Sequence, residues 1–572
     1  MQDASREGPH ASRNTKAKRS QGPPASSDGA FRLETEVQDF DFIIVGSGSA
    51  GAAIAARLSE NPRYTVLLIE AGGSDFTPLV RIPLLHPFLF SNPKYNWKFE
   101  MEPSPEVNNR RLYQGCGKVF GGSSSINGMI YIRGNPADYD EWARLGCKGW
   151  GWNDVLPYFL KSEDNESLSG GLHAKNGPLH VSGQQKANEV TEAALEAYEQ
   201  AGFVLLDDLN GDTREGAGFY QFTVREGQRW SSARAFLSSA RKRNNLTILK
   251  RAMVDKILVK NRRATGGEVA VAGRRQRVVA KKEVIVSAGT FNSPTLLQRT
   301  GIGPGAILVS LGIEIVHDLP GVGENLQDHF GTYLPYRCTL PVTSNDIANS
   351  RFRQALAGIQ YILTRSGPLA RSGMNIGGFA KSDPDLKQPD LQIHFGAFGV
   401  ASRNPKGVVP YPFPAVSFVP VHLNADARGS VTIADQNAGG TPPIIHQNFL
   451  STQNDIDAMI GGMRIARSIA SQPALQPYLR EELNPGPDTQ TDEDLLADLR
   501  QRGVPNLHPV GTCAMGTGKM AVTDSRLRVH GMDGLRVADA SIMPKIIAGN
   551  TNAPTIMIGE KAAAMILQDW KT

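Results

Sequence analysis

Apolar and small residues dominate the stretch DFIIVGSGSAGAAIAARLSE, at positions 41–60, and their spacing changes midway. The run DFIIV predicts a short buried strand, whereas AAIAARL places apolar residues at the spacing of one helix face. A glycine- and serine-rich turn, Gly46 to Gly51, joins the two. A second apolar run, TVLLIEAGG, predicts another strand, which ends in Glu70. The pattern therefore predicts a strand–turn–helix–strand unit.

The glycine turn has the spacing of a dinucleotide-binding site. Gly46 allows a tight turn, Gly48 removes a side chain where a pyrophosphate must approach, and Gly51 permits close packing of helix on strand. The helix N-terminus that follows offers free N–H groups and a positive dipole end to the phosphates. A carboxylate at the end of the next strand, Glu70, can accept hydrogen bonds from ribose hydroxyls. These features predict a bound dinucleotide, but they do not separate FAD from NAD.

Apolar and polar residues also alternate in VPVHLNADARGSVTIAD, at positions 419–435. This alternation predicts an antiparallel strand pair with a turn near Arg428 and Gly429.

The first 40 residues differ from the rest, because they are rich in Ser, Ala, Pro, Lys and Arg and contain no apolar core. They are typical of a disordered tail and not, as written, of a secretory signal peptide. No run approaches the roughly 18 to 20 apolar residues of a membrane span. We expect a protein without a transmembrane segment, either cytoplasmic or peripherally associated with a membrane.

Length and composition narrow the class further. A chain of 572 residues is too long for one simple core, so it should form two or more domains or one large interleaved pair. The net charge is +5, but no dense stripe of lysine and arginine with interleaved aromatics occurs, so no nucleic acid is expected as a partner. The four cysteines lack metal-ligand spacing. They predict neither a metal site nor a disulfide framework, although a single bridge stays open.

Five blocks of sequence resemble the glucose–methanol–choline (GMC) family of flavin oxidoreductases. GCGKVFGGSSSINGMIYIRGNPADYDEW (115–142) is similar to the first family signature, and SAGTFNSPTLLQRTGIG (287–303) to the second. HPVGTCAMG (508–516) resembles the block that carries the active-site histidine. GLRVADASIMP (534–544) and GNTNAPTIMIGEKAA (549–563) follow in family order. Within the family, the sequence looks most like bacterial aliphatic and choline-type alcohol dehydrogenases.

The resemblance implies an α/β fold, in which a Rossmann-like FAD-binding domain is interleaved with an α+β substrate-binding domain built on an antiparallel sheet. The expected parts are a disordered tail at 1–40, FAD-binding segments at 41–150, 241–330 and 501–572, and substrate-binding segments at 151–240 and 331–500.

The resemblance also implies that the dinucleotide is FAD. Relatives with a covalently attached flavin use a histidine in the flavin loop, where this chain has Ile126, so we expect non-covalent FAD. Cys116 and Phe120 depart from the family, in which arginine and an aliphatic residue are usual at these places. The residues expected at the cofactor are Gly46, Gly48, Ser49, Ala50, Gly51, Glu70, Ala71, Gly117, Val119, Gly122, Ser123, Asn127, Gly128, Met129, Ile130, Val254, Ala288, Asp539, Ala540, Asn550 and Asn552.

Two residues are expected to carry the chemistry. His508 resembles the family base, which would take the hydroxyl proton of an alcohol while a hydride passes to flavin N5. Pro509 restricts the backbone of this histidine. Asn550 stands where the family carries a second histidine or an asparagine, and could hydrogen-bond the substrate oxygen. His329, in NLQDH, is interpreted as part of the loop structure and not as catalytic.

The substrate is expected to be a neutral primary alcohol, aliphatic or aromatic, with oxygen or a quinone as electron acceptor. Choline-oxidising relatives carry a glutamate where this chain has Asn375, which disfavours a choline dehydrogenase or oxidase but leaves it as an alternative. A fatty acid photodecarboxylase is also disfavoured, because Leu423 replaces its cysteine. A hydroxynitrile lyase with FAD stays open, as does the choice between oxidase and dehydrogenase.

Overall fold

The computed structural model describes residues 38–183, 188–436 and 440–571. Most of the expected tail, residues 1–37, lies outside these ranges. Its expected end at residue 40 is wrong, because the first strand, β1 (Gln38–Val45), already begins at Gln38. The backbone from Gln38 to Phe40 pairs in parallel with Val278 to Ala280, so this part of the chain is held in a sheet.

The first sheet has seven strands and contains the unit predicted from the opening pattern. The strands lie in the order β12–β2–β1–β15–β14–β13, with β29 paired to β15. Both predicted strands are confirmed as β1 and β2, which pair in parallel, and the predicted helix is confirmed as α1. The bounds are β2 Val66–Glu70, β12 Leu246–Lys250, β13 Ala252–Lys260, β14 Arg263–Val271, β15 Arg274–Val286, β29 Leu535–Val537 and α1 Ser49–Leu58.

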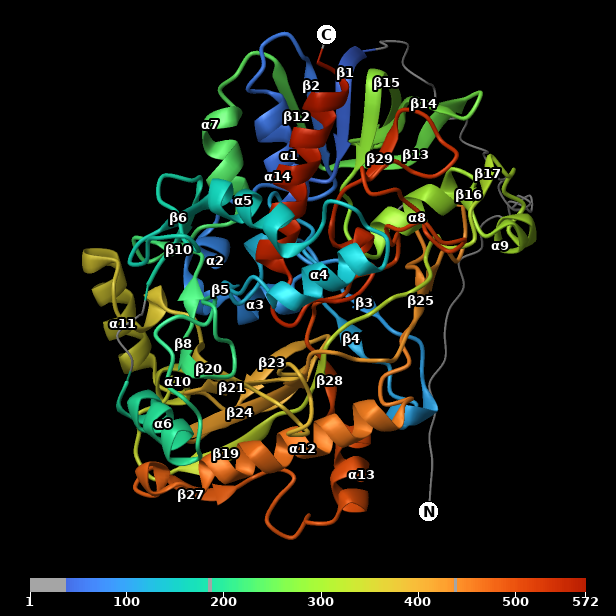
Figure 1. Cartoon of the computed structure of the whole chain (residues 1–572). Coiled ribbons are helices and arrows are strands. Elements are labelled where there is room, and N and C mark those ends of the chain that lie inside the picture. The colour runs from blue at the N-terminus through green and yellow to red at the C-terminus, as the bar shows by residue number, and fades with distance from the viewer. Residues whose placement is uncertain (1–37, 184–187, 437–439, 572) are drawn as a thin grey trace, which may run out of the picture.

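Two helices from opposite ends of the chain pack along each other beside this sheet, α1 and α14 (Asn552–Asp569) (Figure 1). Arg57 of α1 binds Glu560 of α14 through two hydrogen bonds of 2.7 and 2.8 Å. A Cβ atom at Gly559 would lie 2.6 Å from the carbonyl oxygen of Ala50, so only glycine permits this approach. The last helix therefore brings the C-terminal motifs to the glycine turn.

The second sheet has eight strands, in the order β27–β19–β24–β21–β20–β8, with β18 joined to β24 and β28. Neighbouring strands of this sheet pair antiparallel. Helices α12 and α6 pack against it. The bounds are β8 Gly216–Phe219, β18 Phe330–Gly331, β19 Leu334–Cys338, β20 Met374–Ala380, β21 Leu391–Gly396, β24 Ala415–His422, β27 Leu479–Glu482, β28 Val504–Pro505, α6 Glu189–Gln200 and α12 Gln453–Ala470.

The strand pair predicted at 419–435 is wrong. Its first half is β24, which pairs with β18, β19 and β21, and its second half, β25 (Ser430–Thr432), pairs instead with β26 (Ile444–His446). The connecting backbone is bound elsewhere, because Asp455 of α12 accepts hydrogen bonds from the N–H groups of Asp426 and Ala427. These bonds turn the chain away from β24 before a hairpin can form.

Smaller elements connect the two sheets. The other helices are α2 Pro78–Arg81, α3 Pro87–Phe90, α4 Pro136–Arg144, α5 Trp152–Ser162, α7 Ser238–Ala240, α8 Asn292–Arg299, α9 Gly305–Ser310, α10 Ser344–Ala348, α11 Arg351–Thr364 and α13 Asp492–Arg502. The two-stranded pairs include β3 (Phe99–Glu100) with β4 (Tyr113–Gln114) and β5 (Ile130–Tyr131) with β9 (Gln221–Phe222). None of the helices in the described ranges is long and apolar enough to cross a bilayer.

Each sheet has its own hydrophobic core. The first core includes Ile43, Leu68 and Val537 from the strands of the first sheet, and the second includes Ile393, Phe418 and Met463 around the second sheet. The strands of each sheet come from separate stretches of the chain, so the chain passes repeatedly between the two sheets. The exact boundaries of the two expected domains stay a prediction.

Candidate active site

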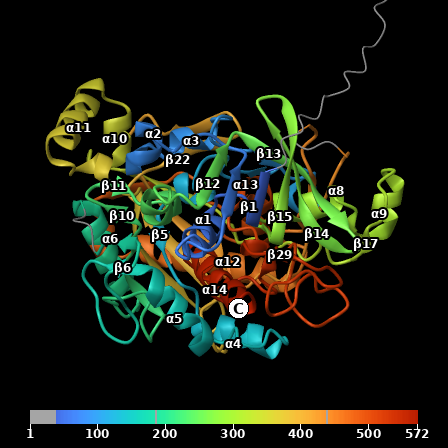
Figure 2. The same cartoon turned by 90° about the horizontal axis from the view of Figure 1, so that it is seen from above.

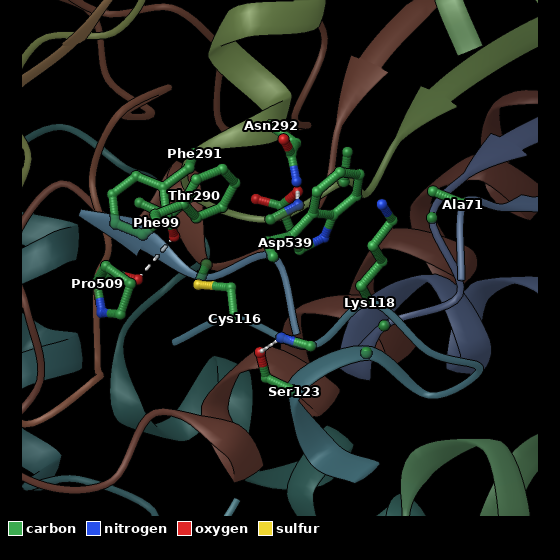
Figure 3. Close-up of a pocket in the computed structure, with 18 of the residues that line it drawn as sticks. Ala71, Phe99, Cys116, Lys118, Ser123, Thr290, Phe291, Asn292, Pro509 and Asp539 are labelled. Carbon is green, nitrogen blue, oxygen red and sulfur yellow. Dashed lines mark hydrogen bonds between the residues drawn. The ribbon is translucent and has the colours of Figure 1, made fainter. Parts of the chain in front are cut away.

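A cavity of about 500 Å³ is lined by loops at the ends of the first sheet and by residues of the second core. The lining segments include the turn before α1, the end of β2, the loop around 115–130, the start of α8, and residues 506–509 and 539–555. Figure 3 shows part of the wall, where Phe99, Phe291, Cys116 and Pro509 face the same space. This volume lies in the range of small-molecule and cofactor sites.

Most residues predicted at the cofactor line this one cavity, and so do both predicted catalytic residues. The set comprises Gly46, Gly48, Ser49, Ala50, Glu70, Ala71, Gly117, Gly122, Ser123, Asn127, Gly128, Met129, Ile130, Val254, Ala288, His508, Asp539, Ala540, Asn550 and Asn552.

Three predicted residues are not part of the wall. Gly51 packs behind the turn, where an added Cβ would lie 2.0 Å from the carbonyl oxygen of Gly46. Val119 is buried in a small separate cluster with Leu89. Asn375 lies on β20, where its carbonyl accepts a hydrogen bond from the backbone of Tyr220. A direct contact of these three residues with a ligand in the cavity stays a prediction.

The glycine turn leaves space where a phosphate is expected. A Cβ atom at Gly48 would meet nothing within 4 Å, whereas one at Gly122 of the neighbouring loop would lie 2.8 Å from the Cα of Gly48. The N-termini of α1 and α14 meet here, because Ser49 donates a 2.8 Å hydrogen bond to Asn552. Two helix N-termini at one cavity wall favour an anionic ligand.

Glu70 ends β2 as predicted and is held firmly. Its carboxylate accepts hydrogen bonds from the backbone N–H and the hydroxyl of Ser47, at 3.0 and 2.7 Å, and from the N–H of Gly72 at 2.7 Å. Burial raises the pKa of Glu70, and these hydrogen bonds oppose the rise. The carboxylate still has lone pairs for a donor from the cavity.

The loop from 117 to 130 is fixed from behind by an arginine that the sequence analysis did not single out. Arg229 is buried and donates hydrogen bonds to the side chain of Asn127 at 2.8 Å and to the carbonyl of Ser124 at 3.2 Å. Burial lowers the pKa of Arg229 to about 9. No local pattern marks this residue, because its partners lie about a hundred positions earlier.

His508 is held by contacts on both sides of its ring. Its Nε2 atom lies 3.1 Å from Nδ2 of Asn550, and its Nδ1 atom lies 3.0 Å from Nδ1 of His329. Its backbone N–H donates to Asp328 at 2.7 Å. The carbonyl of Pro509 accepts a 2.7 Å hydrogen bond from Thr290 (Figure 3). These contacts leave the imidazole little freedom to turn.

His329 therefore contacts the predicted base, although the sequence interpretation assigned it to loop structure. The two imidazole rings are nearly perpendicular, with centroids 5.2 Å apart. A hydrogen bond between two Nδ1 atoms requires one ring to donate and the other to accept. The residues are 179 positions apart, so no spacing in the sequence could reveal this contact.

Burial keeps these histidines neutral near neutral pH. It lowers the pKa of His508 to about 3, and nearby His394 lowers it further. Burial likewise lowers the pKa of His394 to about 3 and that of His329 well below its usual value. A neutral imidazole can accept a proton, so the site contains a base in its competent state.

One buried acceptor beside this base has no protein partner. In the described part of the chain, Oδ1 of Asn550 is buried and accepts no hydrogen bond. Buried polar atoms without partners are rare in native proteins. Because Asn550 lines the cavity, its free oxygen is a place for a ligand donor such as a hydroxyl group.

Aromatic rings form part of the cavity wall. Trp97 and Phe99 lie with ring centroids 6.0 Å apart, and Phe291 meets Phe99 edge-on at 5.3 Å. No motif in the sequence predicts this aromatic wall.

Three carboxylates line the cavity: Glu70, Asp435 and Asp539. Of these, Asp539 is bound to Gly289 and Ser541 by 2.8 Å hydrogen bonds from their N–H groups.

The described residues contain neither a disulfide nor a cluster of metal ligands. All four cysteines are free, so no single bridge forms. Within residues 38–183, 188–436 and 440–571, no group of histidine, cysteine, aspartate or glutamate side chains could hold a metal ion.

Comparisons with known proteins agree with this geometry. Two family models, both described as GMC oxidoreductase, match residues 40–331 and 425–559. The "Oxygen-dependent choline dehydrogenase" of Pseudomonas fluorescens (strain SBW25) is 43% identical over 536 residues, which cover 92% of this chain and 94% of that protein. The protein of the same name from Sinorhizobium fredii (strain NBRC 101917 / NGR234) is 43% identical over 532 residues, covering 92% and 95%.

Solved structures match over nearly the whole chain. Pyridoxine 4-oxidase from "Mesorbium loti" is 30% identical with a TM-score of 0.83, covering 92% of this chain and 98% of that one. Formate oxidase of Aspergillus oryzae RIB40 is 27% identical with a TM-score of 0.87, covering 94% and 99%. Fold, cavity and sequence agree, and this chain belongs to the GMC oxidoreductase family of FAD-dependent enzymes that oxidise alcohols.

Proposed function

We propose that the protein oxidises a primary alcohol to the aldehyde, with His508 as the base and Asn550 as the hydrogen-bonding partner of the substrate oxygen. The observation that supports this most is the pair itself. His508 Nε2 and Asn550 Nδ2 lie 3.1 Å apart on the wall of the cavity, and the histidine is neutral because it is buried. General bases act best when they are unprotonated at working pH and within hydrogen-bond reach of the proton.

The protein residues account for the proton. A substrate hydroxyl that replaces the Asn550 amide as the donor to Nε2 can give its proton to His508, while the released amide donates to the oxygen as negative charge develops on it. The lowered pKa makes His508 a weak base in the empty site, and negative charge on a bound alkoxide would favour its protonated form. Bound FAD would supply the hydride acceptor for the carbinol carbon.

The cavity residues fit FAD. The open space at Gly48 and the N-termini of α1 and α14 suit a pyrophosphate, and Glu70 is placed for the ribose of the adenosine. We propose that FAD is bound without a covalent bond, because Ile126 occupies the place of the histidine that attaches flavin in some relatives. Acid or heat should release intact FAD from the yellow protein. Flavin that stays with the denatured chain would overturn the non-covalent assignment.

We propose that the preferred substrate is a neutral alcohol, aliphatic or aromatic. The cavity wall presents Trp97, Phe99 and Phe291, and each of its three carboxylates already accepts a hydrogen bond from the protein. A wall of aromatic side chains favours a substrate that is uncharged and apolar apart from its hydroxyl group.

Choline is the second candidate, because the similar proteins from Pseudomonas fluorescens and Sinorhizobium fredii are named as choline dehydrogenases. The same aromatic rings could also contact a quaternary ammonium group. Anaerobic reduction of the bound flavin by a panel of alcohols separates the two candidates. Faster reduction by benzyl alcohol and short aliphatic alcohols than by choline supports the neutral substrate, and the opposite order supports choline.

The residue at 375 gives an independent test of the substrate assignment. Asn375→Glu should improve reduction by choline if this side chain faces the substrate, because it adds a negative charge. Asn375→Gln is the matched control, since it lengthens the side chain without a charge. Equal rates for both variants would show that Asn375 is not part of the substrate site.

Oxygen and a quinone are the proposed electron acceptors. After anaerobic reduction by alcohol, mixing with air or with a soluble quinone shows which of the two reoxidises the flavin faster. Analysis of the products tests the hydroxynitrile lyase alternative, because a lyase would release aldehyde without reducing the flavin.

A further inference from the structure

Large apolar side chains are exposed together on helix α11 (Arg351–Thr364). Phe352 and Leu363 are 72% and 76% exposed, and Leu356 and Ile359 are at least half exposed. These four residues follow the spacing i, i+4, i+7 and i+11, so they form one line along the helix. We call them the apolar stripe. Ile362, which is 73% exposed, lies beside it.

The apolar stripe faces away from the protein. Only Ala357 and Tyr361 of this helix are buried, and they lie on the opposite side of the helix. The hydroxyl of Tyr361 donates a 3.1 Å hydrogen bond to the carbonyl of Gly227, which ties this side to the rest of the molecule. Figures 1 and 2 both show α11 at the outer edge of the molecule. A helix normally buries its apolar face, and here that face is the exposed one.

Two arginines flank the apolar stripe, and a third, Arg365, lies over the ring of Tyr361 at the end of the helix. Arg351 and Arg353 precede and follow Phe352, so a rotation of about 100° per residue places one on each side of the stripe. Arg365 follows the end of the helix. The chain carries no aspartate or glutamate between Asp346 and Asp383. Within the described residues, none of these three arginines forms an ion pair with a carboxylate.

We propose that α11 docks the protein on the surface of an anionic lipid bilayer. The apolar stripe would enter the boundary between headgroups and acyl chains, and the arginines would contact the phosphate groups. Long arginine side chains suit this position, because they can extend from the sides of a buried helix back to the headgroups. The docked helix lies in the plane of the surface and does not span the membrane.

A second copy of the chain fits this surface less well. The helix has 14 residues and is therefore about 21 Å long, so its stripe covers on the order of 200 Å². A stable dimer buries about 800 Å² on each partner. Pairing about a two-fold axis would also bring the arginines of both helices together with no acid on this segment to balance them. Area and charge both favour lipid as the occupant.

Vesicle flotation of the full, flavin-loaded protein tests the proposal. The protein should float with vesicles containing phosphatidylglycerol more than with vesicles of phosphatidylcholine alone, and high salt should weaken binding. Leu356→Ser combined with Ile359→Ser should lower binding by about tenfold or more, because two apolar side chains are lost. Arg351→Gln combined with Arg353→Gln should lower binding to phosphatidylglycerol vesicles by about fivefold or more.

The matched control is Val309→Ser on α9, which replaces another apolar side chain that is 65% exposed. It should bind as the wild type does. Flavin reduction by a soluble alcohol should stay normal in every variant, because none of these residues lines the cavity, and this shows that each variant is folded.

Four results would overturn the proposal. The wild type could remain unbound with both kinds of vesicle, or the stripe variants could float as well as the wild type. Equal binding to neutral and anionic vesicles would contradict the role of the arginines. A concentration-dependent dimer that the stripe variants abolish, without lipid binding, would assign α11 to self-association instead. The flotation needs no turnover, so its outcome is independent of the proposed function.

Discussion

The role of His508 depends on its neighbours more than on its own residue type. The chain has 11 histidines, and His508 is one that is half-buried, is kept neutral by a lowered pKa and lies within 3.1 Å of a cavity amide. His508 and Asn550 could be predicted because both stand in motifs that resemble a family. The contact with His329 could not be predicted, since it depends on how two distant loops meet and how the rings turn. The same holds for Arg229 behind the flavin loop.

Replacement of the proposed base is the first test at this scale. His508→Ala should slow flavin reduction by alcohol by about a hundredfold to ten-thousandfold, because the hydroxyl proton loses its acceptor. The flavin should stay bound, since the turn at Gly48 and the carboxylate of Glu70 are unchanged. Anaerobic stopped-flow spectroscopy measures the rate, and the flavin-to-protein absorbance ratio measures occupancy. Near-normal rates in the loaded variant would remove His508 from the mechanism.

The buried neutral state of His508 has a consequence for stability. Its pKa is about 3 in the folded protein, below the value of about 6.5 in an unfolded chain. Between these two values the unfolded state binds more protons, so this histidine makes the folded state less stable as the pH falls below about 6.5. His508→Asn removes this effect. From about pH 7 to about pH 5, the unfolding free energy of the variant should rise by about 2 kcal/mol relative to the wild type.

Urea unfolding at the two pH values measures this difference. The corresponding substitution at the exposed His446 is the control for loss of a histidine from the surface. A difference between variant and wild type that does not change with pH would mean that His508 is not held neutral in the folded protein.

Helices and strands could be predicted where apolar residues recur at a single regular spacing and the elements that pack together are close in sequence. The unit of β1, α1 and β2 spans about thirty residues, and its apolar spacing specifies both strands and the helix. The pair expected at 419–435 has an equally clear pattern, yet β24 and β25 belong to different sheets. Alternation predicts that a segment is a strand but not which strand it pairs with. Here the partners of β24 and the turn contacts with Asp455 decide the outcome.

Two glycines of the first turn have different expected roles. Gly51 allows the helix to pack on the strand, whereas Gly48 leaves space for the ligand. Gly51→Ala places a methyl group 2.0 Å from the carbonyl oxygen of Gly46, so it should lower the unfolding free energy by about 1–3 kcal/mol. Gly48→Ala meets no protein atom within 4 Å, and the change in unfolding free energy of the FAD-free protein should stay within about 0.5 kcal/mol. Gly48→Ala should nevertheless lose FAD affinity, because its methyl group enters the space expected for the pyrophosphate.

Urea unfolding of the FAD-free variants measures the unfolding free energy, and titration with FAD measures the affinity for FAD. Normal FAD binding by Gly48→Ala would contradict the placement of the pyrophosphate at this turn. Normal stability of Gly51→Ala would show that the strand–helix contact can relax.

At the scale of the whole molecule, the cavity joins the two cores. Its wall includes Ile69 and Val254 from the first core and Phe99 and Phe291 from the second. The resemblance to a family implied two interleaved parts, and the α/β fold is confirmed by the solved structures that match the chain. The aromatic wall and the pairing between distant strands could not be predicted, because both result from packing across segments that are far apart in sequence.

A ligand that contacts both cores should stabilise the whole molecule. Removal of FAD should lower the unfolding temperature, and FAD added at about a hundred times its dissociation constant should restore about 2.7 kcal/mol. FMN lacks the adenosine that Glu70 is proposed to bind, so it should restore much less. Thermal unfolding of the FAD-free protein with each nucleotide measures this. Equal rescue by FMN would contradict the role of Glu70, and no rescue by FAD would show that the cavity between the two cores is not where the cofactor binds.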